Sequence, residues 1–209
     1  MRNVLADLAL ESEAALALTM RVARAMDNQD DEHEKLLSRL ATPVGKYWVC
    51  KRTPNHAYEA MEVIGGSGVM ENHIMPRLFR ESPINAIWEG SGNVQCLDIL
   101  RAIGKQPEVL QAYLSEVNKA RGGDPRLDRF VDQLQESVTR TDELQYRARN
   151  LADRLALALQ GSLLVRHAPN HVADAFCASR LEATGGLNYG TLSTGLDCAA
   201  ILDRARARA

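Results

Sequence analysis

The residues best suited to chemistry in this sequence lie within positions 80–95, and they centre on the carboxylate of Glu89. Trp88 precedes Glu89, and two glycines bracket Ser91 just before an apolar helical pattern begins at Val94. A serine at such a position can cap a helix, and the unpaired N–H groups of a helix N-terminus favour an anion or an acceptor atom of a cofactor. Alone, this pattern indicates a site but names no reaction. The alternative is that Glu89 is only a solvated turn residue.

A second unusual stretch is the glycine-rich turn at residues 65–68, which follows a helical pattern carrying Ala57, Met61 and Ile64. Because it follows a helix instead of a strand, and no lysine comes after it, it is neither a dinucleotide-binding fingerprint nor a P-loop. One glycine would be enough to cap a helix C-terminus. Three glycines in four residues predict that a ligand or another backbone approaches closely.

Composition and charge exclude several classes of protein. The 209 residues are 45% hydrophobic, with 25 basic against 27 acidic side chains, so bulk charge indicates no particular partner. No apolar run is long enough to span a membrane, and the first residues lack the apolar core of a signal peptide. The four cysteines form no CxxC pair, which fits reduced thiols in the cytoplasm better than disulfides. Pro169 separates His167 from His171, so no metal site is predicted.

The hydrophobic periodicity predicts an all-α fold with no strand. Pro43 and Pro54 are expected to interrupt the second helix, with Thr53 capping a restart, and residues 65–90 are expected to be irregular. Gly185, Gly186 and Gly190 are expected to form a loop before the last helix. The expected helices cover residues 3–26, 36–64 in two pieces, 94–103, 107–121, 124–164, 169–181 and 195–206.

Two segments together resemble the C-terminal helical domain of the acyl-CoA dehydrogenase family. Residues 60–68 resemble the family's helix that ends in a Gly-Gly-x-Gly turn, and residues 80–95 resemble the segment in which a glutamate is the catalytic base of many members. The resemblance implies an antiparallel helical bundle at residues 1–106, with an additional helical region at 107–209 packed on it. It also implies FAD, whose contacts in this sequence would be Glu62, Gly65, Gly66, Gly90, Ser91 and Asn93. The contacts of the glycine turn would reach the FAD of a neighbouring subunit.

Three shorter motifs resemble the subgroup of alkylation-response flavoproteins of the AidB type. They are residues 4–11, 47–52 and 88–93. Three departures from the ordinary dehydrogenase pattern point in the same direction. Trp88 stands where tyrosine is common, Glu62 where glutamine is common and Cys96 where a basic residue is frequent.

The reaction implied by the resemblance is α,β-dehydrogenation of an acyl-CoA-like thioester, with Glu89 as base and FAD as hydride acceptor. An ordinary carboxylate is a weak base, so burial must raise its pKa, and Trp88 is expected to supply that burial. Trp88 is also expected to narrow the acyl pocket, to which Arg80 is assigned as well. The family's N-terminal helical and middle β domains are absent from these residues. The chain alone is therefore expected to bind FAD weakly and to have no turnover.

Two other functions stay open. The subgroup suggests a DNA-binding or protective module in the alkylation response. Every lysine or arginine after Lys119 is an arginine, and guanidinium groups suit the phosphates of double-stranded DNA, although acidic residues are interspersed almost one for one. The candidate DNA contacts are Arg140, Arg147, Arg149, Arg154 and Arg166. The third possibility is that these helices only build a homo-oligomer, either a dimer or a tetramer.

Overall fold

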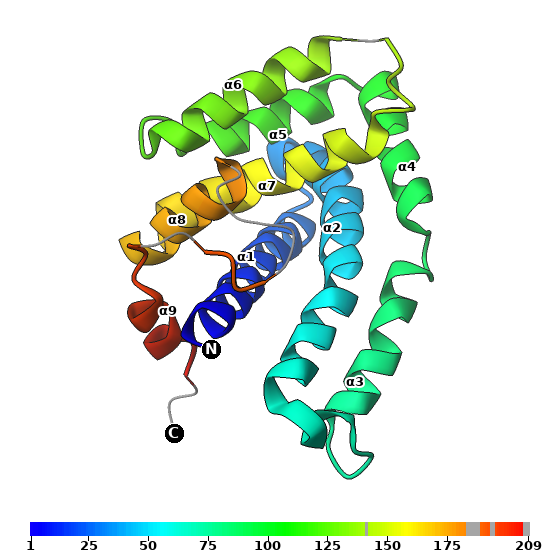
Figure 1. The fold of residues 1–209 in the computed structure, drawn as a ribbon. Helices are drawn as coiled ribbons and strands as arrows, with labels where there is room; N and C mark the ends of the chain where they lie inside the picture. The colour runs from blue at the N-terminus through cyan, green and yellow to red at the C-terminus, as the bar shows by residue number, and fades with distance from the viewer. Residues whose placement is uncertain (141, 183–188, 193–194, 207–209) are drawn as a thin grey trace.

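The computed structural model describes residues 1–140, 142–182, 189–192 and 195–206, and every regular element among them is helical (Figure 1). This confirms the predicted all-α fold. No helix in these ranges is long and apolar enough to cross a lipid bilayer. The α-helices are α1 (Arg2–Asp27), α2 (Glu32–Ile64), α3 (Met75–Glu81), α4 (Gly92–Lys105), α5 (Glu108–Asn118), α6 (Pro125–Thr139), α7 (Ala148–His167), α8 (Asn170–Phe176) and α9 (Cys198–Ala205). Two 3₁₀ segments, η1 (Gly65–Val69) and η2 (Ser82–Ala86), and a π segment, η3 (Cys177–Leu181), complete the regular elements.

Helix α2 runs without interruption, and the prediction that its two prolines would break it is wrong. Thr53 does not cap a new helix at Pro54, because its hydroxyl donates to the carbonyl of Val49, one turn back, at 2.7 Å. Helix α2 packs against α1, α4, α5 and α7 in the bundle, and against η1, α3 and η2 beyond it. This burial outweighs the backbone hydrogen bonds that the prolines remove, so the helix stays continuous.

The single helix expected over residues 124–164 is two helices, α6 and α7, because the chain turns back on itself between them (Figure 1). Glu143 in this turn has a left-handed φ of 52°. The Arg147 guanidinium fastens the turn by donating to the carbonyls of Arg140 at 2.6 Å and Asp142 at 3.2 Å. The reversal lays the apolar face of α6 on α7, whereas one continuous helix would leave that face in water.

The stretch at residues 65–90, expected to be irregular, contains helix α3 and both 3₁₀ segments. Pro76 and Pro83 stand in the first turns of α3 and η2, where the missing N–H of proline removes no helical hydrogen bond. The final helix is shorter than predicted, at Cys198–Ala205. Of the predicted loop glycines, Gly185 and Gly186 lie outside the described residues, and Gly190 lies in a turn with φ 84°.

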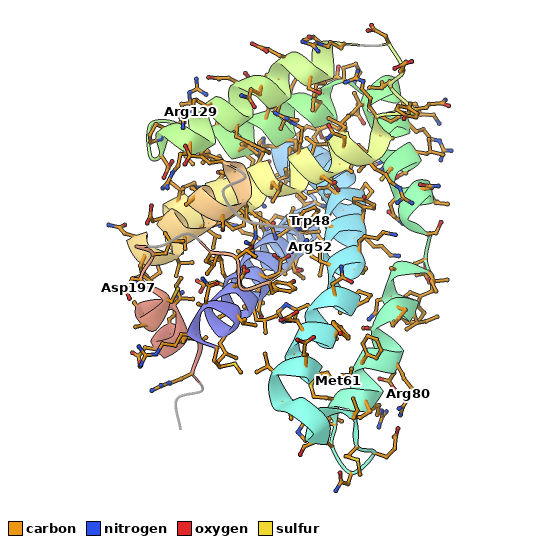
Figure 2. All side chains as sticks on the ribbon, viewed as in Figure 1. Trp48, Arg52, Met61, Arg80, Arg129 and Asp197 are labelled. Carbon is orange, nitrogen blue, oxygen red and sulfur yellow. The ribbon has the colours of Figure 1, made fainter. Side chains whose placement is uncertain are left out.

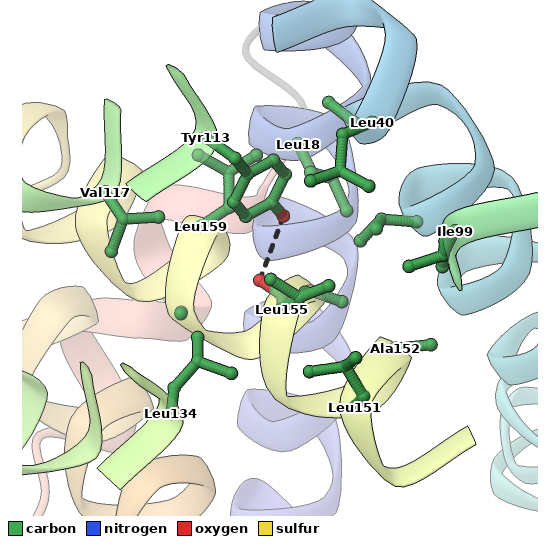
Figure 3. Packing of buried hydrophobic residues seen from close by; sticks show 14 of the residues in the cluster. Leu18, Leu40, Ile99, Tyr113, Val117, Leu134, Leu151, Ala152, Leu155 and Leu159 are labelled. Atoms are coloured by element: carbon green, nitrogen blue, oxygen red, sulfur yellow. Dashed lines mark hydrogen bonds between the residues drawn. The ribbon is translucent and has the colours of Figure 1, made fainter. Parts of the chain in front are cut away.

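The main hydrophobic core lies where α1, α2, α4, α5, α6 and α7 meet (Figure 3). Tyr113 is fully buried there, and its hydroxyl donates to the carbonyl of Leu155 at 3.0 Å, so its one polar group is satisfied. A second cluster beneath α9 joins the N-terminal part of α1 to α7 and α8, with Leu10, Phe176 and Ile201 at its centre. Helix α1 contributes buried side chains to both clusters.

One fully buried carboxylate, Glu116, joins three helices through ion pairs. It accepts hydrogen bonds from Arg21 of α1 at 3.0 Å, from Lys119 at 2.6 Å and from Arg166 of α7 at 2.9 Å. Burial opposes ionisation of Glu116, but these three cations outweigh it and hold its pKa well below the usual range. The bundle therefore contains a charged cluster that is satisfied internally.

Residues 50–91 form an arm that extends away from this bundle (Figure 1). The arm consists of the C-terminal half of α2 with η1, α3 and η2 packed along it. In this fully described stretch, no residue belongs to either core cluster. Nine large apolar side chains of the arm are exposed: Tyr58, Ile64, Val69, Met70, Ile74, Leu78, Ile84, Ile87 and Trp88.

Candidate functional site

Residues 88–91, at the end of the arm, form the loop that leads into α4, and this loop holds Glu89 in a strained backbone conformation. Its φ is 55°, and the left-handed region costs a residue with a side chain about 1–2 kcal/mol. Lys46 Nζ holds the loop by donating to the carbonyls of Trp88 at 2.7 Å and Gly90 at 2.8 Å. The side-chain amide of Gln95 donates to the carbonyl of Glu89 at 2.9 Å. Strain that the surroundings fix in this way is typical of functional sites.

Helix α4 begins directly after this loop and presents its N-terminus beside Glu89. Ser91 occupies the N-cap position, as predicted, but its hydroxyl makes no capping hydrogen bond. A Cβ atom on Gly92 would lie 3.8 Å from Lys51 Nζ, and Arg149 Nε donates to Asn93 Oδ1 at 2.8 Å. Backbone N–H groups of a helix N-terminus, with two cations close by, fit an anionic group such as the phosphates of FAD.

The expectation that Trp88 buries Glu89 is not met within this chain. Both side chains are exposed, Trp88 to 60%. A large groove of about 1110 Å³ lies elsewhere, between α1, the end of α7 and α9, and Glu89 does not line it. A carboxylate on an open loop is not desolvated by its own chain. Any burial of Glu89 would have to come from protein or ligand outside these residues.

The glycine-rich turn adopts the close backbone approach that its composition predicted. Gly65 caps α2 with φ 74°, and a Cβ on Gly68 would stand 2.3 Å from the carbonyl oxygen of Met61. Glycine is therefore required at position 68, and the contact is with the protein's own backbone. Glu62 is exposed one turn before the cap.

The structure does not bring the two predicted cofactor segments together. The Glu89 loop lies beside Lys46 on α2, and the glycine turn begins at Gly65, where the same helix ends. A helix rises 1.5 Å per residue, so these two points are about 28 Å apart along α2. Arg80 lies with Met61 toward the far end of the arm and pairs with Glu71 at 2.7 Å (Figure 2). Arg80 is thus not gathered with Trp88 and Glu89.

The five arginines assigned to DNA have different environments. Arg166 donates to the buried glutamate of the core, and Arg147 fastens the turn before α7. The guanidinium of Arg154 lies 4.9 Å from the centre of the Phe130 ring of α6, and burial lowers the pKa of Arg154. Arg140 and Arg149 are exposed. Arg149 also donates to Asn93, so four of the five guanidinium groups already contact the protein.

Sequence reasoning missed Lys46 and Gln95, which hold the loop, and Arg149 as a neighbour of Asn93. Lys46 stands directly before the motif at residues 47–52, so a local signal existed. Its hydrogen-bond partners are more than forty positions away in the sequence, and only the fold places them together.

Cys96 is buried in the core, where burial raises the pKa of its thiol to about 11, so the thiol is unreactive and serves in packing. Among the described residues there is no group of three potential metal ligands.

Comparison with known proteins supports the resemblance seen in the sequence. Residues 1–104 match the family model described as "Acyl-CoA dehydrogenase, C-terminal domain". The chain is 40% identical over 188 residues to AidB of Escherichia coli (strain K12), an alignment that covers 90% of this chain and 34% of AidB. It is 27% identical over 192 residues to acyl-CoA dehydrogenase family member 11 of Caenorhabditis elegans, covering 79% of this chain and 31% of that protein.

A solved structure shows the same fold. The crystal structure of Caenorhabditis elegans ACDH-11 in complex with C11-CoA superposes with a TM-score of 0.76 at 24% identity, covering 82% of this chain and 34% of that chain. The present chain spans about a third of the length of each of these relatives.

Proposed function

This chain belongs to the acyl-CoA dehydrogenase family, and we propose that it forms the C-terminal part of an FAD-dependent oxidoreductase that acts on the CH–CH bond of an acyl-CoA-like thioester. The observation that carries this proposal is the loop of Glu89. A carboxylate is held there in a strained conformation, directly before a helix N-terminus with cations beside it. The family's reaction needs a base and a cofactor that carries phosphates, and this arrangement offers a carboxylate and a helix N-terminus that can receive an anion.

Glu89 is the proposed base. Its carboxylate would take the α-proton of the thioester, and the loop hydrogen bonds from Lys46 and Gln95 would keep it aimed at the substrate. Trp88, exposed here, would line the acyl pocket once the rest of the protein or the substrate covers it. That cover would take the Glu89 carboxylate out of water, as its proposed role as base requires.

The N-terminus of α4 is the proposed contact for the phosphates of FAD. Ser91 and Asn93 would face them with the first-turn N–H groups, and Gly90 allows the backbone to turn into α4 with φ 101°. When bound, FAD would accept the hydride from the β-carbon of the substrate. The chain alone offers only this edge of the site, so we expect weak FAD binding and no turnover from it.

The glycine turn at the far end of the arm would serve a different FAD molecule. Glu62 and Gly65 lie about 24 Å and about 28 Å along α2 from the level of Glu89, and Gly66 follows Gly65. Two cofactor segments so far apart on one chain are consistent with a homo-oligomer in which each arm reaches the site of a neighbouring subunit. The exposed apolar side chains of the arm would be buried by that association.

The test of the proposal is Glu89→Gln in the complete protein. We expect the variant to keep its bound flavin spectrum and to lose turnover by about 10²–10⁴-fold, because the base is removed without a change of shape. Glu81→Gln is the matched control, since Glu81 is an exposed glutamate on α3 that pairs with Arg77. Unchanged turnover in Glu89→Gln, or an equal loss in the control, would remove Glu89 from the role of base.

Binding of double-stranded DNA is a second candidate function. Its support in the structure is the exposure of Arg140 and Arg149. Arg149 uses its Nε in the contact with Asn93, and its remaining N–H groups could still donate to phosphates. Such binding would be indifferent to base sequence and would weaken steeply with salt. The double variant Arg140→Gln with Arg149→Gln should weaken a duplex shift evenly across sequences. Wild-type protein that gives no shift at low salt would end this proposal.

A further inference from the structure

One contact links the start of α4 to a part of the chain beyond the matched family domain. Arg149, in the first turn of α7, donates from Nε to Asn93 Oδ1 at 2.8 Å, across 56 positions of sequence. Asn93 lies in the first turn of α4, and the family match ends at residue 104. The additional helices therefore touch the candidate site directly.

The position of Arg149 is unfavourable for its own helix. The N-terminus of a helix carries partial positive charge, so a cation in the first turn costs about 0.3–1 kcal/mol. The first turn of α7 contains no acidic residue to offset Arg149. The favourable partner of this arginine is instead on α4, which indicates that the contact between the helices is what the residue serves.

The hydrogen bond also sets the orientation of the Asn93 amide. Because Oδ1 accepts from Arg149, the two Nδ2 hydrogens point away from the arginine and are free to donate. They join the backbone N–H groups of the first turn of α4, where Ser91 makes no capping hydrogen bond. This end of α4 then presents donors and positive charge, which are the requirements of a phosphate group.

Helix α7 supports the same end of α4 from a second residue. Asp153 lies one turn after Arg149, on the same face of α7. It interacts with the hydroxyl of buried Tyr47, and the ring of Tyr47 would stand 3.4 Å from a Cβ on Gly92. Arg149 thus contacts the first turn of α4 through the side chain of Asn93. Asp153 interacts with Tyr47, whose ring lies against the backbone of Gly92.

We propose that Arg149 is a positioning residue for the phosphate groups of FAD, acting through Asn93, so that the helical region after residue 106 is part of the cofactor site. This inference rests on the proposed function, because it assumes that the N-terminus of α4 receives the FAD phosphates. The new element is the role of α7, whose Arg149 would orient Asn93 toward the phosphates.

The experiment is a titration of the 209-residue chain with FAD, followed by backbone and side-chain amide NMR shifts. Riboflavin, which lacks phosphates, is the ligand control. FAD should shift the amides of residues 92–95 and the Asn93 side-chain amide, and riboflavin should not. Arg149→Met should weaken FAD about threefold, the size expected for one exposed charge-assisted hydrogen bond. Arg24→Met, an equal charge change at an exposed arginine of α1, should leave FAD affinity unchanged.

A double-mutant cycle separates positioning from simple attraction by charge. If Arg149 acts through Asn93, then Arg149→Met combined with Asn93→Ala should bind FAD no more weakly than the more affected single variant. Additive losses, or an Arg149→Met variant that binds FAD like the wild type, would overturn the inference while the cofactor site stands. Wild-type chain whose α4 amides do not respond to FAD, or respond equally to riboflavin, would overturn the phosphate site and this inference with it. Circular dichroism and thermal unfolding of each variant verify the fold.

Discussion

The bundle and the arm differ in how they treat their apolar side chains. In the bundle, leucines such as Leu155 and Leu159 are fully buried, and the charged cluster of Glu116 is satisfied by its own cations. In the arm, Leu78 and Ile87 are exposed, and charged pairs such as Arg80 with Glu71 lie in solvent. The bundle buries its apolar side chains and pairs its buried charges, whereas the arm leaves large apolar side chains exposed.

This difference explains where the candidate site lies. Glu89 stands at the junction of the two regions, with Lys46 of the bundle end of α2 holding its loop. The bundle supplies rigidity, and the arm supplies exposed apolar surface of the kind that marks interaction sites. A site at such a junction is fixed in backbone geometry but still open to solvent in the chain described here.

The largest expected effect concerns the buried charge of the bundle. Glu116→Ala leaves Arg21, Lys119 and Arg166 without their shared partner, and we expect a loss of about 3–5 kcal/mol in the free energy of unfolding. Glu71→Ala in the arm, which also breaks a Glu–Arg pair, should cause no measurable loss. Urea unfolding followed by circular dichroism measures both. Equal losses would refute the contrast between the two regions.

A matched pair of leucines tests the same contrast through packing. Leu155→Ala removes a fully buried side chain and should lower the free energy of unfolding by about 2–5 kcal/mol. Leu78→Ala, on the exposed face of α3, should change it by less than about 0.5 kcal/mol. If Leu78→Ala proved as damaging as Leu155→Ala, the arm would have a core of its own.

Acid should weaken the bundle through Glu116. Its pKa is lower in the folded chain than the ordinary value of 4.5, so its stabilisation is complete above that value and declines as the pH falls toward the folded pKa. From this group alone we expect the free energy of unfolding to be about 2 kcal/mol lower at pH 3 than at pH 7. Glu11, whose pKa is also lowered, acts in the same direction. Urea unfolding at the two pH values should show the loss, and constant stability would contradict it.

The smallest effect is expected at the junction. Lys46→Met removes two hydrogen bonds to the loop but leaves the core intact, so the free energy of unfolding should fall by about 1 kcal/mol or less. The local effect should be larger, seen as faster hydrogen exchange of the Gln95 amide, which bonds the carbonyl of Ser91. Lys105→Met, an exposed lysine at the far end of α4, is the control. Equal exchange in both variants would mean that Lys46 does not hold the loop.

The sequence alone determined the helical fold and most helix positions, because apolar residues at a period of 3.6 define a buried face locally. It also placed the helix start at Ser91 and the close approach of glycines at residues 65–68. It failed where packing overruled local signals. Proline predicted breaks in α2 that burial against four helices prevents, and a continuous apolar stripe concealed the reversal between α6 and α7.

Only the tertiary structure decided how the candidate site is assembled. The contacts of Lys46 with Gly90 and of Arg149 with Asn93 join residues more than forty positions apart, and no local pattern encodes such pairs. The exposure of Glu89 and the distance of the glycine turn from it were equally invisible in the sequence. Residue types and spacing specify which groups are present and how the chain coils nearby. Burial, ion pairing and distance depend on which helices finally pack together, and these determine what the groups can do.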